Sequence, residues 1–98
     1  MYGNIFKRDL RLAQMSAGME PTGYKGDIDE KVLSNVLMFR WQDSIGMPIV
    51  QFLDGVLQVI GKKQMAFWKE EIDSFVNKRR GEGKITMHHG NMYVGAAM

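Results

Sequence analysis

Apolar side chains recur at helical spacing along most of the chain, and glycine and proline residues separate the stretches in which they do so. The breaks fall at residues 18–26, 46–48, 61 and 81–83. They leave four amphipathic stretches and a C-terminal segment of different character. The sequence therefore predicts a mainly α-helical fold: a compact bundle of about four helices with a C-terminal β-hairpin or extended arm.

The first helix is predicted over about residues 4–17, with Asn4 as its N-cap and Gly18 as its stop. The second is expected to begin at Ile28. There Asp27 and Glu30 have the spacing of a capping box, with aspartate in the place of serine or threonine.

The second helix carries two lines of apolar residues, and Leu33, Leu37 and Trp41 form the second of them. The two lines lie roughly 150° apart at about 100° per residue. A surface helix needs only one apolar stripe. A helix with two is expected to be enclosed on both sides, either within the domain or between the domain and a partner.

Pro48 suits the first turn of a third helix, because the N–H that proline lacks has no helical partner there. A fourth helix is predicted from Gln64 to Arg80. The apolar stripes before and after Gly61 differ in phase by roughly 120° at about 100° per residue, so a turn at residues 61–63 lets both helices face one core.

Beyond Gly83, apolar and polar residues alternate as they do in strands. The pair Gly90–Asn91 predicts a two-residue hairpin turn with glycine first. A two-stranded hairpin is marginal alone in water, so it should dock on the helices or pair with a neighbouring subunit. The organisation expected is a helical domain over residues 1–80 and a glycine-hinged hairpin or arm over 81–98.

Composition places the chain among small globular domains, since its 98 residues are 45% hydrophobic and 24% charged. The absence of cysteine excludes thiol nucleophiles, disulfides and cysteine-bound zinc. His88 and His89 are adjacent, so on a strand they would point to opposite faces and chelate one metal poorly. Residues 81–84 lack the pattern of a phosphate-binding loop. We therefore predict no enzyme activity, cofactor, metal site or small-molecule substrate.

The start of the chain has no apolar leader, which argues against a secretory signal. The most apolar stretch, residues 45–60, is too short to span a bilayer and contains polar residues. The expected location is intracellular, or within a virus particle assembled in the cytoplasm.

Apolar side chains exceed what so small a domain is expected to bury: nine Met, five Phe, two Trp and three Tyr. Methionine and aromatic residues outside a core stripe are typical of interfaces, and the apolar tail that ends in Met98 is expected to pack against something. We predict a non-enzymatic structural or assembly protein that contacts other subunits in a homo- or hetero-oligomer; a virus or phage particle is one natural setting. The predicted partner interface consists of Leu33, Leu37, Trp41, Phe67, Met92, Tyr93, Val94 and Met98.

Basic residues around the fourth helix suggest an alternative, a small nucleic-acid-binding regulator in which this helix and the hairpin act like those of a winged helix. The residues concerned are Lys62, Lys63, Lys78, Arg79, Arg80 and Lys84. Acidic residues within the same helix and a formal net charge of only +2 oppose this interpretation. A helix C-terminus also attracts cations without any ligand.

Overall fold

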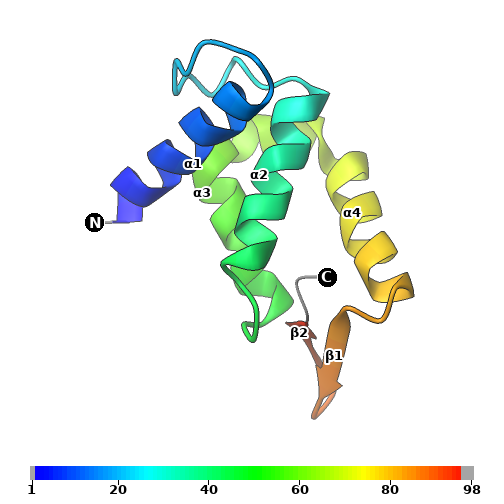
Figure 1. The fold of residues 1–98 in the computed structure, drawn as a ribbon. Helices are drawn as coiled ribbons and strands as arrows, with labels where there is room; N and C mark the ends of the chain where they lie inside the picture. The colour runs from blue at the N-terminus through cyan, green and yellow to red at the C-terminus, as the bar shows by residue number, and fades with distance from the viewer. Residues whose placement is uncertain (1, 96–98) are drawn as a thin grey trace.

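The computed structural model describes residues 2–95, and the side chains from residue 6 onward. Within this range the chain forms four α-helices followed by an antiparallel β-hairpin, which confirms the predicted fold (Figure 1). The elements are α1 (Tyr2–Ser16), α2 (Glu30–Gln42), α3 (Ile49–Phe67), α4 (Lys69–Gly81), β1 (Ile85–His88) and β2 (Asn91–Val94).

Helix α2 occupies the middle of the molecule, with α1 on one side, α3 behind and α4 on the other side (Figure 1). The core centres on Trp41, whose ring meets Phe52 edge to face at 5.1 Å and Phe75 at 5.8 Å between ring centroids. None of the helices within residues 2–95 has the length and apolar character that crossing a bilayer requires.

The predicted capping box at Asp27 is wrong, because α2 begins at Glu30 and its N-cap is Asp29. The Asp29 carboxylate accepts a hydrogen bond from the Val32 N–H at 2.8 Å. Asp27 accepts instead from the Thr22 hydroxyl at 2.9 Å, which ties it to the preceding loop. Both Asp27 and Asp29 are suitable N-cap residues by type, and the hydrogen bond of Asp27 to the loop leaves Asp29 as the cap.

The predicted break at Gly61 is confirmed as a kink inside α3, where Gly61 has φ 85° and ψ 164°. The chain then resumes a helical path to Phe67 and breaks again at Trp68, so α4 starts at Lys69 rather than at Gln64 as predicted. The Trp68 indole N–H donates to Oε1 of Gln64 at 3.0 Å and holds the second bend in place.

The predicted hairpin is confirmed, but its turn lies at His89–Gly90, one residue earlier than predicted. Both residues have positive φ, 51° and 79°, as a type I′ turn requires. This register pairs Ile85 with Val94, the hairpin residues that pack on the helical core. A shift of one residue would turn one strand's apolar face outward, so core contact selects the register over the glycine-first turn.

The hairpin docks on its own helices through β2 and the loop between α2 and α3. The Val94 N–H donates to the Met47 carbonyl at 2.8 Å, and the Gly46 N–H donates to the Val94 carbonyl at 2.8 Å. Val94 itself is buried. Of the two possibilities left by the sequence, docking on the same domain is the one the structure shows.

A buried ion pair links α1 to α2 and was missed by the sequence analysis. Nη1 of Arg40 lies 2.6 Å from the Asp9 carboxylate, and both side chains are almost fully buried. Helix α3 packs closely here because Gly55 has no side chain: a Cβ at that position would lie 3.1 Å from Nε of Arg40. The Asp9–Arg40 ion pair is therefore a point at which α1, α2 and α3 all pack against one another.

Candidate protein interaction surface

Half of the predicted interface residues have a different role in the structure. Leu33, Leu37, Trp41 and Val94 are each at most 3% exposed within a single chain. The second apolar line of α2 is buried within the chain, and its residue Trp41 packs against Phe75 of α4. The domain itself therefore encloses α2 on both sides, as the two apolar lines implied. Trp41 and Val94 are core residues, and the predicted contact with a partner is corrected for them. Leu33 and Leu37 are buried to the same degree, so even where they line a groove each offers a partner at most 3% of its surface.

The other predicted interface residues lie at scattered places. Phe67 is 72% exposed at the bend before α4, with its ring edge to face with Trp68 at 5.0 Å between centroids. Met92 is exposed on the hairpin and Tyr93 is half-buried beside it. Met98 lies outside the described residues. Phe67 and Met92 are exposed enough to contact a partner, but they lie on different elements, at the end of α3 and in β2, and the predicted residues do not form one continuous surface.

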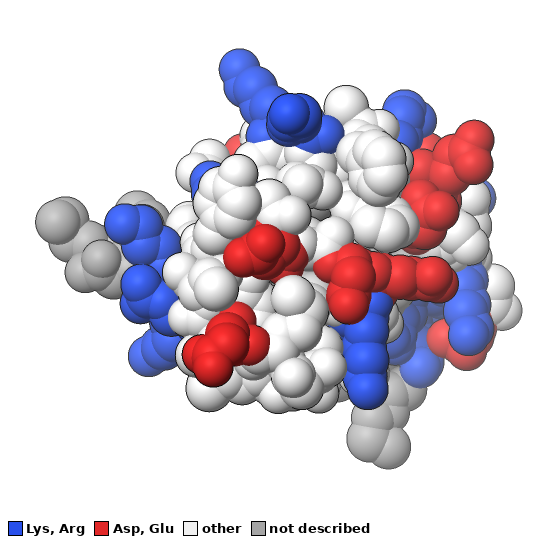
Figure 2. Space-filling model, turned by 90° about the horizontal axis from the view of Figure 1, so that it is seen from above, with Lys and Arg blue, Asp and Glu red and all other residues white. Residues whose placement is uncertain are grey.

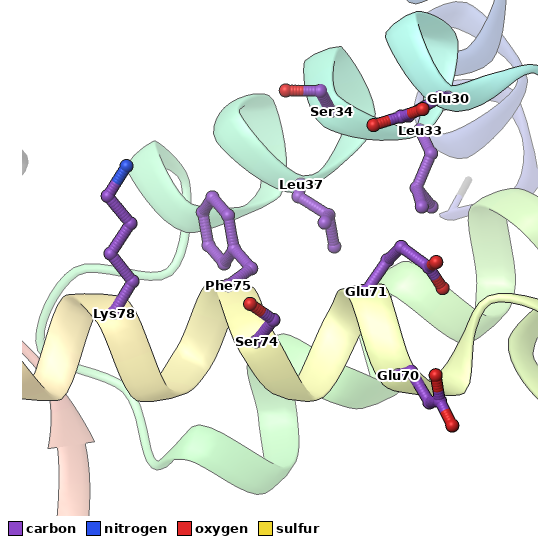
Figure 3. A pocket seen from close by; sticks show the side chains of 9 residues that line it. All are labelled: Glu30, Leu33, Ser34, Leu37, Glu70, Glu71, Ser74, Phe75 and Lys78. Carbon is purple, nitrogen blue, oxygen red and sulfur yellow. The ribbon is translucent and has the colours of Figure 1, made fainter.

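A groove of about 620 Å³ runs between α2 and α4 and was not identified from the sequence. Leu33 and Leu37 reach into it from α2, and Phe75 faces them from α4 (Figure 3). Ser34 and Ser74 add a small hydroxyl group on each wall. The groove is lined by Glu30, Leu33, Ser34, Leu37, Glu70, Glu71, Ser74, Phe75 and Lys78.

Charge is distributed unequally along this groove. Glu30, Glu70 and Glu71 lie at the end where α2 and α4 begin, and Lys78 lies toward the other end (Figure 3). Seen from the end at which both helices begin, Asp and Glu side chains spread over the middle and one side of the surface, with Lys and Arg side chains around the rim (Figure 2). The helix dipole stabilises carboxylates in the first helical turn, so these residues also have a structural role. Together they also make the upper part of the groove acidic.

The hairpin presents a second, smaller apolar surface. Met87 and Met92 are cross-strand partners and therefore share one face of the hairpin. Both are exposed, as are Ile45 and Met47 in the loop against which β2 packs. This end of the molecule therefore carries an exposed apolar surface of its own.

Arg79, one of the predicted nucleic-acid contacts, is engaged inside the fold. Its guanidinium lies over the ring of Phe75 at 4.6 Å and over that of Trp41 at 5.8 Å, measured to the ring centroids. Such cation–π contacts stabilise the attachment of α4 to the core. Arg79 is therefore occupied in holding the fold together.

The remaining basic candidates lie at the two ends of α4. Lys62 and Lys63 lie before it, whereas Lys78, Arg80 and Lys84 lie at or beyond its end. A helix of 13 residues is about 20 Å long at 1.5 Å per residue, so the two groups do not form one patch. Lys84 also faces the Glu82 carboxylate at 3.4 Å.

Along the exposed side of α4, a hydrogen bond from Lys69 to Asp73 raises the pKa of this lysine above its ordinary value. The Nζ–Oδ2 distance is 2.8 Å, and both side chains are largely exposed. The pair is one turn of helix apart and supports α4 locally.

The histidine prediction needs one correction. His89 belongs to the turn rather than to β1, so strand alternation does not separate the two rings, and their centroids lie 4.2 Å apart. Within the described part of the chain, no group of three or more His, Cys, Asp or Glu side chains is placed to hold a metal ion.

Comparison of the chain with models of protein families, with curated proteins and with solved structures gives no match. The class that the structure defines is a small four-helix domain with a docked hairpin and an open groove between α2 and α4. That groove is the candidate functional site.

Proposed function

We propose that this protein is a small, non-enzymatic assembly protein that acts through protein–protein contacts, with the α2–α4 groove as its contact site. The observation that carries the proposal is the groove's construction: apolar side chains at its floor, and hydroxyl and charged groups at its rim. An apolar centre within a polar rim is the usual arrangement of a protein interface. A groove between two helices is also a common receptor for an amphipathic helix.

The way α4 is attached supports the same proposal. Ile72 is the buried residue of α4, while Phe75 and Val76 are only half-buried. A helix held by so few buried side chains leaves apolar surface beside it for a partner to cover. The groove is thus open because α4 does not close onto α2 along its length.

Site-specific photocrosslinking in living cells of the source organism tests this proposal. A photoreactive amino acid replaces Ser74 on the groove wall in one variant and Gln51, exposed on α3, in a matched control. Position 74 should give discrete protein adducts that position 51 does not, because only the first faces the occupied groove. Equal adducts from both positions, or none from either, would contradict the proposed function.

Two finer predictions from the sequence remain predictions. One is a setting within a virus or phage particle, and the other is the nucleic-acid-binding alternative. The separation of the basic residues along α4 and the engagement of Arg79 with Phe75 give the alternative no support beyond that of the sequence.

A further inference from the structure

The outward face of α1 is a second exposed surface. Positions 7, 8, 11, 12 and 15 fall within one stripe about 140° wide at about 100° per residue. Their side chains are all exposed: three are cations and the other two, Leu12 and Met15, are 41% and 50% exposed. The acidic residue between these positions of α1, Asp9, is buried and pairs with Arg40. The stripe of α1 itself is therefore basic and apolar, and the exposed Asp43 lies beside Arg8 and Leu12 at its edge.

This stripe matches the groove in length. From Lys7 to Met15 the helix rises about 12 Å at 1.5 Å per residue. The α4 wall of the groove, from Glu70 to Lys78, covers the same number of residues and the same rise. Two turns of α1 therefore cover the groove from one end to the other.

The two surfaces also match in charge. Lys7, Arg8 and Arg11 lie in the first part of the stripe, and Leu12 and Met15 in the second. With α1 laid parallel to α2 and α4, the cations face Glu30 and Glu71, and the apolar pair covers the floor near Phe75, whereas Glu70 points away from α2 (Figure 3). The C-terminal end of α1, which carries partial negative charge, then lies toward Lys78.

We infer that the occupant of the α2–α4 groove is helix α1 of a second copy of this chain. The inference rests on the proposed function and names its partner. A chain cannot fill its own groove in this way, because its α1 lies on the far side of α2 from α4 (Figure 1). The contact joins two different surfaces, so each copy offers both a groove and a helix, and the assembly grows head to tail.

Charge-reversal variants with a mixing step test the inference by sedimentation velocity, over a range of concentrations and at low and high salt. One variant, Lys7→Glu with Arg8→Glu, makes the stripe acidic. The other, Glu30→Lys with Glu71→Lys, makes the groove basic. We expect the wild type to associate with rising concentration and less so at high salt. Each variant alone should self-associate at least about tenfold more weakly, because like charges then face each other.

An equimolar mixture of the two variants should recover association, since the acidic stripe of one now meets the basic groove of the other. A merely misfolded variant could not be rescued in this way. Matched controls carry the same changes in net charge outside both surfaces: Lys62→Glu with Lys63→Glu, and Glu20→Lys with Asp54→Lys. These should associate as the wild type does.

Because Glu30 and Glu71 lie in first helical turns, their reversal can also lower helix stability. The variant Ser74→Arg blocks the groove and leaves those carboxylates in place, and it should weaken self-association while circular dichroism shows an unchanged fold. Wild-type protein that stays monomeric, variants that associate as the wild type does, or a mixture that shows no recovery would each overturn the inference. Adducts from position 74 to a different protein would leave the proposed function standing without it.

Discussion

Helices α1, α2 and α3 are held together very differently from α4. The first three share a buried ion pair between Asp9 and Arg40, and most of the buried apolar residues. Gln14, fully buried, also accepts from the Gly23 N–H at 2.9 Å and so fixes the loop that follows α1. Helix α4 has only Ile72 buried and borders an open groove.

The difference suits the two regions to different roles: α1 to α3 provide stability, and α4 borders the surface proposed for binding. A closely packed three-helix unit can hold the fold, while the weakly attached helix leaves a surface that a partner can complete. Segments with few buried contacts are also those that open most readily within a native structure. The proposed contact site thus lies where the fold is least complete by itself.

The largest expected effect comes from Trp41→Ala. Trp41 is 1% exposed and contacts both Phe52 and Phe75, so its removal should leave a cavity that joins the two regions. Unfolding in urea should show a loss of about 3–5 kcal/mol, typical of a buried tryptophan. A stable monomer with near-normal unfolding would instead restore Trp41 to the interface that the sequence suggested.

Breaking the ion pair should affect the three-helix unit almost as strongly. Arg40→Met leaves the buried Asp9 carboxylate without its cation and should cost about 3 kcal/mol in the free energy of unfolding. The double variant Asp9→Leu with Arg40→Met should recover much of that loss, because no buried charge remains. If the double variant is no more stable than the single one, the ion pair is not what matters at this site.

On α4 the corresponding substitution is Ile72→Ala, with an expected loss of about 2 kcal/mol, the low end for such a truncation because the surroundings are open. Hydrogen exchange should show its effect concentrated in α4, with the amides of α1 to α3 little changed. Uniform acceleration across all four helices would mean that α4 belongs to the same cooperative unit.

The smallest effects distinguish two glycines, one at the kink inside α3 and one at the last residue of α4. Gly61→Ala places a side chain at φ +85° and within 3.2 Å of Lys25, and should destabilise by about 1 kcal/mol. Gly81→Ala, in open space at the end of α4, should stabilise by about 0.5 kcal/mol through helix propensity. Thermal unfolding of the two variants should therefore shift in opposite directions, and shifts of the same sign would contradict the kink at Gly61.

The sequence predicted the helices and hairpin well because periodicity reports burial directly. The sequence could not show whether the second apolar line of α2 is buried by the same chain or by a partner, because both produce the same pattern. In the structure Leu37 faces α4 of the same chain. The choice of Asp29 over Asp27 as N-cap depended on hydrogen bonds in the loop, and the break at Trp68 on a contact with Gln64. Such contacts leave no periodic signal.

The groove was beyond sequence reasoning for a related reason. It exists because α2 and α4 lie side by side in space without closing on one another, and Leu33 and Phe75 are 42 residues apart in the chain. From the sequence, Glu30 was assigned to a capping box, and the acidic residues of the fourth helix counted only against nucleic-acid binding. Only their convergence gives them a second role.

The proposed contact between α1 and the groove is tested by amide hydrogen exchange of the wild-type protein, compared between a dilute monomeric sample and a concentrated one. We expect slower exchange in the concentrated sample in α1, in the α4 segment that lines the groove and in the first turns of α2, with the hairpin unchanged. Protection confined to residues 85–94, or an exchange pattern that does not depend on concentration, would contradict it.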